Sequence, residues 1–178
     1  MFVDESGFYL LPGVVRTYAP RGQTPILRPF QTHDHLSVMS GITMEGNLYT
    51  MVHDRALTSA DSVIFLRHLV RRVSSKLLVV WDGSPIHKGQ VKTFLTNGGA
   101  RHLHLEQLPP YAPDLNPDEG VWQHLKHVEL RNVCCSDLSH LRSELRYAIV
   151  RLRRKPHSSV FPGCRSLHEK LTFGCNGQ

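Results

Sequence analysis

The stretch Leu77-Leu78-Val79-Val80-Trp81-Asp82 is an uninterrupted apolar run that ends in a carboxylate. A run of this kind, without polar alternation, is typical of a strand buried on both faces of a sheet. A catalytic carboxylate must be anchored by a core and exposed at its edge, so Asp82 is a candidate for a site at the end of this strand. An ordinary strand-ending turn at Asp82 and Gly83 is the alternative.

Two other acidic residues have comparable settings. Asp4 directly follows the apolar pair Phe2-Val3 at the start of the chain. Glu119 lies where a proline-rich loop enters a helix, since Asn116 can cap that helix and Pro117 suits its first position. Glu119 at the positive end of a helix dipole also has a purely structural interpretation.

The remaining pattern predicts a mixed α/β sheet with helices on its faces. Strands are expected at the first residues, near 14–18, and over 36–42, 48–52, 77–81 and 101–107. Helices are expected over 58–73, 88–96, 117–130 and 138–154, with Pro156 ending the last. The third of these helices is expected to bury Val121, Trp122, Leu125 and Val128.

Composition limits the classes of protein that fit. The 178 residues suit one domain, or one domain with a short helical tail, and the net charge of +6 mildly favours a polyanionic partner. No apolar stretch approaches the ~18 to 20 residues of a membrane helix and no targeting segment begins the chain, so a cytoplasmic protein without a membrane partner is expected. The spacing of the four cysteines favours reduced thiols over a zinc site.

Four blocks of sequence resemble, in order, the signatures of the DDE-type transposases of bacterial insertion sequences, most closely the IS six-thirty branch of the Tc/mariner superfamily. The blocks are Asp4-Glu5-Ser6-Gly7-Phe8, Arg21-Gly22-Gln23-Thr24-Pro25, Trp81-Asp82-Gly83-Ser84-Pro85-Ile86-His87-Lys88, and the run from Leu108 to Trp122. The resemblance covers roughly residues 1 to 130.

The resemblance implies a ribonuclease H-like fold, in which a mixed central sheet is flanked by helices. It also implies that Asp4, Asp82 and Glu119 are the catalytic triad and bind Mg²⁺, with Mn²⁺ as a substitute. Two such ions ~4 Å apart suit phosphodiester cleavage, first with water and then with a 3′-hydroxyl as the nucleophile. Asp118 is the neighbouring competitor for the role of Glu119, and the family pattern favours Glu119.

The partners implied are double-stranded DNA, as transposon terminal inverted repeats and as target DNA at TA sites, and a second copy of the chain as a homodimer on DNA. Candidate DNA-binding residues are His87, Lys88, Arg142 and Arg146. His87 has other interpretations, as a contact to a metal-bound water or as a plain loop histidine. The arginines fit a solvated helix face almost as well as a phosphate-binding face.

These patterns divide the chain into a catalytic domain over 1–133 and a C-terminal helical tail over 134–178 packed on it. The helix-turn-helix DNA-binding region of longer relatives is expected to be absent, so a separate segment would supply it. Gly83 departs from the asparagine that often follows the second aspartate of the family. The main prediction is a metal-dependent transposase catalytic domain; the alternatives are a non-catalytic remnant that only associates with DNA or oligomerises, and a stand-alone nuclease of the same fold.

Overall fold

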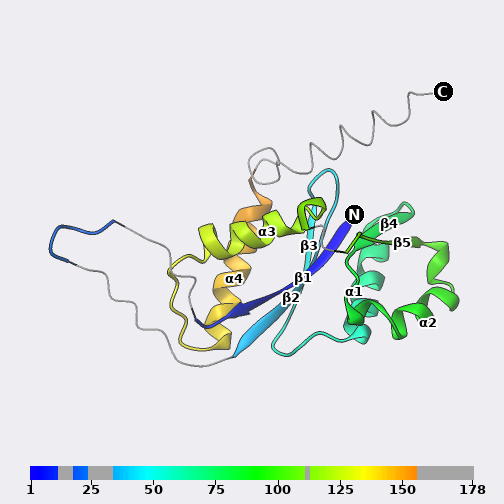
Figure 1. Ribbon diagram of the computed structural model, residues 1–178, viewed down its shortest axis with the longest axis horizontal. Coiled ribbons are helices and arrows are strands. Elements are labelled where there is room, and N and C mark those ends of the chain that lie inside the picture. The colour runs from blue at the N-terminus through cyan, green and yellow to red at the C-terminus, as the bar shows by residue number, and fades with distance from the viewer. Residues whose placement is uncertain (12–17, 24–33, 111–112, 156–178) are drawn as a thin grey trace, which may run out of the picture.

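The computed structural model describes residues 1–11, 18–23, 34–110 and 113–155. Its strands are β1 (Phe2–Tyr9), β2 (His35–Ile42), β3 (Leu48–His53), β4 (Leu77–Trp81) and β5 (Leu103–Gln107). Its helices are α1 (Ser59–Arg72), α2 (Gln90–Thr96), α3 (Asp118–His124) and α4 (Leu138–Arg153), with 3-10 turns η1 (Pro85–His87), η2 (Gly99–Arg101) and η3 (Pro113–Leu115) and a π-helical turn η4 (Leu125–Glu129). The strands form one sheet in the order β3-β2-β1-β4-β5, in which β1 to β3 are antiparallel and β4 is parallel to both its neighbours. The predicted mixed sheet flanked by helices is confirmed (Figure 1).

β1 is longer than the sequence suggests. The apolar pattern ends at Val3, yet all eight residues of the strand pair antiparallel with β2. Residues 4–7 carry polar or small side chains, so hydrophobic patterning does not mark them as strand. Backbone pairing with β2 extends the strand without that signal. Asp4 therefore lies inside a paired strand, which corrects the expectation that it follows the strand's end.

The sheet carries a separate apolar core on each face. Phe2 and Phe8 of β1 pack with α3 and α4, whereas Val3 packs with α1 and α2. Figure 1 shows these two pairs of helices on opposite sides of the sheet. Because successive strand residues point to opposite faces, the adjacent acids Asp4 and Glu5 are directed to different cores.

β4 joins the two halves of the sheet. It pairs over its whole length with β5, but with β1 only near Phe2, which is opposite Val80. Continuing that parallel register by two residues brings Asp4 level with Asp82, which directly follows β4. The expectation of a strand buried throughout is only partly right, because the side chain of Leu78 is 50% exposed.

α1 begins with a capping box. The Asp61 carboxylate accepts from the backbone amide and the hydroxyl of Thr58, and Arg55 donates two hydrogen bonds to it at 2.7 and 2.9 Å. The hydrogen bond from Arg55 lowers the pKa of Asp61 far below its usual range, although burial opposes this shift. Ser62 connects α1 to the loop that follows β4, because its Oγ donates a hydrogen bond to the carbonyl of Ile86 in that loop.

The helix expected over 117–130 changes its geometry part-way. α3 ends at His124 and continues as the π-helical turn η4, which inserts an extra residue into the helical repeat. The expected burial of Val121, Trp122 and Leu125 is correct, but Val128 is 49% exposed. The π turn explains this error, because it rotates the residues after Leu125 away from the face that a regular helix would bury.

α4 covers the same face of the sheet as α3 and buries the apolar residues expected of it: Leu141, Leu145, Ala148, Ile149 and Leu152. Burying one such side chain contributes about 1.5 to 3 kcal/mol. Arg142 and Arg153 donate to the carbonyls of Val52 and Leu48 on the edge strand β3. α4 therefore packs on the sheet, and the division of the chain into a catalytic domain and a tail at 133/134 stays a prediction.

Several expectations concern residues that the structure does not describe, namely most of the strand near 14–18, the helix stop at Pro156, and Cys164 and Cys175. Cys134 and Cys135 are free thiols, as expected. No helix among the described residues is both long enough and apolar enough to cross a bilayer.

Candidate active site

Asp4 is a buried carboxylate held from two sides. The backbone amide of Glu5 donates to its Oδ1 at 2.8 Å, and the indole Nε1 of Trp122 donates to its Oδ2 at 2.9 Å. Burial raises the pKa of Asp4 to about 6, with smaller contributions in the same direction from the charges of Glu5 and Glu119, although both hydrogen bonds oppose the shift. The fold thus fixes this carboxylate in an environment that disfavours its own charge.

Glu119 and Asp118 are neighbours on α3 but have opposite settings. Glu119 is exposed, and its charge acts on Asp4; no described residue donates a hydrogen bond to its carboxylate. Asp118 is fully buried, and its Oδ1 accepts from Ser40 Oγ at 2.7 Å. Asn116 accepts from the amide of Asp118 at the start of the helix, although the N-cap position itself is occupied by Pro117 and not, as expected, by Asn116. Of the two acids, only Glu119 is accessible to a ligand from solvent.

Burial also dominates the electrostatics of Asp118. It raises the pKa of Asp118 well above its usual range, against the Ser40 hydrogen bond and with support from the charges of Asp4, Glu5 and Glu119. Its Oδ2 is buried and has no hydrogen-bond partner among the described residues. A neutral, protonated Asp118 is the form that this environment favours.

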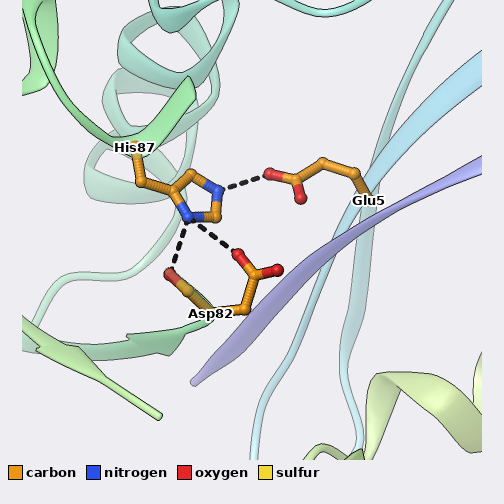
Figure 2. A group of neighbouring side chains, drawn as sticks. All are labelled: Glu5, Asp82 and His87. Carbon is orange, nitrogen blue, oxygen red and sulfur yellow. Dashed lines mark hydrogen bonds and ion pairs between the residues drawn. The ribbon is translucent and has the colours of Figure 1, made fainter. Parts of the chain in front are cut away.

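Asp82 lies beyond β4 with its side chain half exposed. Its Oδ1 accepts from the amide of Ser84 at 2.9 Å and lies 3.1 Å from Nδ1 of His87. The same Nδ1 is 3.0 Å from the Asp82 carbonyl oxygen, and the other ring nitrogen of His87 contacts Glu5. Figure 2 shows Glu5 and Asp82 reaching the imidazole from two sides. No described residue hydrogen-bonds Oδ2 of Asp82, which leaves that oxygen available to a ligand.

Sequence reasoning missed two charged groups at this site. Glu5 lies next to Asp4 in the first signature block, but the resemblance assigns it no role. Lys126 follows Glu119 by seven residues; it is half-buried and donates from Nζ to Ser6 Oγ at 2.7 Å. Burial lowers the pKa of Lys126, while the charges of Glu119 and Asp4 oppose that shift. A seven-residue spacing from Glu119 along the expected helix was the available signal for Lys126.

The four candidate DNA-binding residues lie in different settings. Lys88 and Arg146 are exposed, and Arg142 donates to the edge strand β3. His87 is buried, and both of its ring nitrogens are engaged within the protein. Binding of DNA by these residues stays a prediction, and for His87 the structure provides protein partners instead.

Gly83, where the family often has asparagine, lies against another amide. A Cβ at this position would come within 2.6 Å of the Gln107 side-chain nitrogen. The end of the Gln107 side chain thus occupies the space that a residue larger than glycine would need. An asparagine at position 83 would require Gln107 to move.

Replacing Asp4 by asparagine should stabilise the metal-free chain at neutral pH. Because the folded pKa of about 6 exceeds the ordinary value of 3.8, Asp4 lowers the stability progressively as pH rises from about 4 to about 6. Asparagine keeps an acceptor for Trp122 but loses the acceptor for the Glu5 amide, so the expected net gain is on the order of 2 kcal/mol above pH 6. Urea unfolding of both proteins with a chelator at pH 4 and pH 7.5 measures it. A gain that is equal at both pH values would contradict this account.

The DDE superfamily endonuclease model matches residues 1–142. The chain belongs to this family. No curated protein sequence matches it significantly. The family match covers every element from β1 to the start of α4, including the three predicted triad residues.

Solved structures of the Mos1 transposase share the fold of this DDE family member. The pre-cleavage Mos1 transpososome matches 94% of this chain with a TM-score of 0.71 and 18% sequence identity. The Mos1 strand transfer complex matches 95% of this chain with a TM-score of 0.70 and 18% sequence identity. The isolated Mos1 catalytic domain has a TM-score of 0.62 at 15% identity and covers 94% of this chain, which covers 77% of that domain. The predicted ribonuclease H-like fold is confirmed. This chain spans about half the length of the Mos1 chains in the two complexes.

Proposed function

We propose that this chain is the catalytic domain of a DNA transposase of the IS six-thirty branch, which cleaves DNA at transposon ends and joins them to target DNA. The observation that supports the proposal is that the charge of Glu119 acts on the buried carboxylate of Asp4, while Asp82 is level with Asp4 in the parallel register. Each of these residues comes from a different element of the family fold. Together they supply an acidic site at which a phosphodiester can be cut.

The chemistry of the donor set fits hard divalent cations such as Mg²⁺ or Mn²⁺. All three predicted ligands offer carboxylate oxygens, which these ions prefer over nitrogen or sulfur. Burial and the charges of Glu5 and Glu119 raise the pKa of Asp4, so a bound cation would relieve a repulsion built into the fold. Such ions, when bound, activate an attacking oxygen and stabilise the leaving oxygen of the phosphodiester.

The chain's own residues supply the positioning. Trp122 holds one oxygen of Asp4 and covers it from the helix side, which keeps the carboxylate from rotating. Glu119 approaches from the first turn of α3, where the side chain of Asn116 accepts from the amide of Asp118. Lys126 brings a positive charge close to both Asp4 and Glu119, where a phosphate oxygen of the substrate can accept from its Nζ.

The partners proposed are double-stranded DNA, comprising terminal inverted repeats and target DNA at TA sites, and a second copy of the chain in a dimer on DNA. The solved Mos1 structures include paired-end complexes, one with Mg and one with Mn, which supports this part of the proposal by analogy of fold. A separate DNA-binding segment would recognise the terminal repeats. The domain limits proposed are 1–133 for the catalytic part and 134–178 for the tail.

The length and pairing of β1 argue against a non-catalytic remnant. A remnant without activity would be expected if the first strand were too short to hold Asp4 in place. In the structure Asp4 is within a strand of eight paired residues and is bonded to Trp122, a residue 118 positions away in the sequence. A carboxylate with a raised pKa held in this way is typical of a functional site rather than of a stability device.

Nicking of supercoiled plasmid DNA by the purified chain tests the proposal. We expect nicking with Mg²⁺ or Mn²⁺, none with a chelator, and loss of nicking in the Asp82→Asn variant. Glu106→Gln, which changes an exposed acid on β5, serves as the matched control and should nick normally. Equal nicking by the Asp82→Asn variant and the wild-type chain would refute the proposed site.

A further inference from the structure

His87 is held as rigidly as a core residue, although it is in a loop beside the candidate active site. Its side chain is 4% exposed, and its ring stacks on Trp81 with centroids 3.9 Å apart and planes 5° from parallel. Its backbone is part of the turn η1, which begins with Pro85. The carbonyl oxygen of the preceding residue, Ile86, accepts a hydrogen bond from the hydroxyl of Ser62 on α1. The scaffold therefore sets the orientation of this imidazole.

Both ring nitrogens face oxygen acceptors. Nε2 lies 2.5 Å from Oε1 of Glu5, and Nδ1 lies 3.0 Å from the carbonyl oxygen and 3.1 Å from Oδ1 of Asp82. Nδ1 must be a donor, because a carbonyl oxygen can only accept, and Nε2 shares a proton with the carboxyl group of Glu5. His87 thus links a carboxylate of β1 to the carboxylate that follows β4 (Figure 2).

Asp82, by contrast, has little support of its own. It follows the last residue of β4, precedes Gly83, and has a half-exposed side chain. Among the described residues only the Ser84 amide and His87 contact its carboxylate, and both do so at Oδ1. The direction of Oδ2 therefore depends on how these two partners hold Oδ1.

We propose that Glu5 and His87 form a positioning pair that orients the Asp82 carboxylate, with Oδ1 occupied and Oδ2 presented to the metal. This inference rests on the proposed function, because it assigns a purpose to Asp82 as a ligand. Glu5 fixes the ring through Nε2, and the ring fixes Asp82 through Nδ1. Partners of this kind, behind a metal ligand, typically contribute a factor of about 10 to 100 to metal affinity or activity.

A metal ion bound directly by Glu5, Asp82 and His87 is the competing interpretation, since their ligand atoms lie within 4.8 Å of one another. Two ligands of one ion are each about 2.0 to 2.2 Å from it, which separates them by about 3 Å or more. The Glu5 to His87 contact of 2.5 Å is shorter than that separation and has the length of a direct hydrogen bond. Nδ1 faces a backbone carbonyl oxygen, which can only accept a hydrogen bond. Nδ1 therefore carries a proton and has no free lone pair for a metal ion.

Two substitutions of the same residue separate the roles of the two nitrogens. In His87→Asn the amide nitrogen can replace Nδ1 and keep the bond to Asp82, whereas in His87→Gln it can replace Nε2 and keep only the bond to Glu5. Both variants lose the stack on Trp81, so a merely structural role predicts equal losses. The positioning role predicts nicking within about tenfold of wild type for His87→Asn and a loss of about 100-fold for His87→Gln.

The metal requirement gives a readout that general destabilisation does not move. The Mn²⁺ concentration for half-maximal nicking should rise about tenfold in His87→Gln and less than threefold in His87→Asn. Glu5→Gln keeps an acceptor for Nε2 and should resemble His87→Asn, which keeps the test usable if one His87 variant fails to fold. Circular dichroism and urea unfolding establish which variants are folded.

Asp82→Asn in the same assay distinguishes a failure of the proposed function from a failure of the positioning pair. Retention of nicking by Asp82→Asn would refute the proposed function, whereas its loss together with equal defects in His87→Asn and His87→Gln would overturn only the positioning pair. Calorimetry without DNA gives a second check on the positioning pair. If His87→Asn, His87→Gln and Glu5→Gln all abolished Mn²⁺ binding, the positioning pair would be overturned in favour of a metal bound directly by Glu5, Asp82 and His87.

Discussion

Glu119→Gln should lower metal-dependent nicking by about 10³-fold, because the loss of one ligand charge removes several kcal/mol of stabilisation from the reacting phosphate. The free energy of unfolding should change little, since the Glu119 side chain is exposed and no described residue hydrogen-bonds it. Nicking rates at saturating Mn²⁺ and urea unfolding of the same preparation measure the two effects.

The adjacent Asp118 provides the matched control. Asp118→Asn can keep the acceptor for Ser40 Oγ, and it removes an ionisable group whose pKa burial raises well above its usual range. This variant should therefore nick at close to the wild-type rate and unfold no more easily. If Asp118→Asn lost nicking and Glu119→Gln kept it, the two acids would have been assigned the wrong way round.

Trp122→Ala should destabilise the chain by about 3 to 5 kcal/mol, the usual cost of removing a large aromatic side chain from a core. Trp122 is 4% exposed, packs edge-on against Phe8, and donates to Asp4. The substitution therefore creates a cavity and removes a hydrogen bond at the same time. Urea unfolding at neutral pH with a chelator measures the loss.

Trp122→Phe separates the two effects, because it keeps most of the apolar volume and removes only the indole donor. The hydrogen bond to Trp122 lowers the pKa of Asp4, so its loss should raise that pKa further and weaken Mn²⁺ binding at neutral pH. We expect a small change in stability and an increase of about tenfold in the Mn²⁺ needed for nicking. Unchanged Mn²⁺ dependence in a folded Trp122→Phe protein would show that Trp122 does not position Asp4.

The parts of the fold that the sequence predicts are those with a clear hydrophobic period. The run Leu77–Trp81 and the helix over residues 138–154 are placed almost as predicted, because apolar side chains there pack on a core. The end of β1 and the π turn at Leu125–Glu129 are not predictable in this way. The first depends on backbone pairing with a distant strand, and the second on a local change of helical repeat.

The same limit applies to the candidate site. Asp4, Asp82 and Glu119 can be proposed from ordered motifs, because each follows or begins a recognisable element. The contact between Glu5 and His87 joins residues 82 positions apart and depends on the alternation of side chains along a strand whose extent the sequence hides. Sequence spacing carries no signal for a contact of that kind.

We expect Asp4, Asp82 and Glu119 to bind a divalent cation together, and paramagnetic broadening by Mn²⁺ can detect this binding at each of the three residues. In NMR spectra of the ¹⁵N-labelled chain, the amides of these three residues should broaden at the lowest Mn²⁺ concentrations, and Glu119→Gln should raise the concentration required about tenfold. Broadening that is centred elsewhere on the sheet, or that is the same in the wild-type and Glu119→Gln proteins, would contradict this expectation.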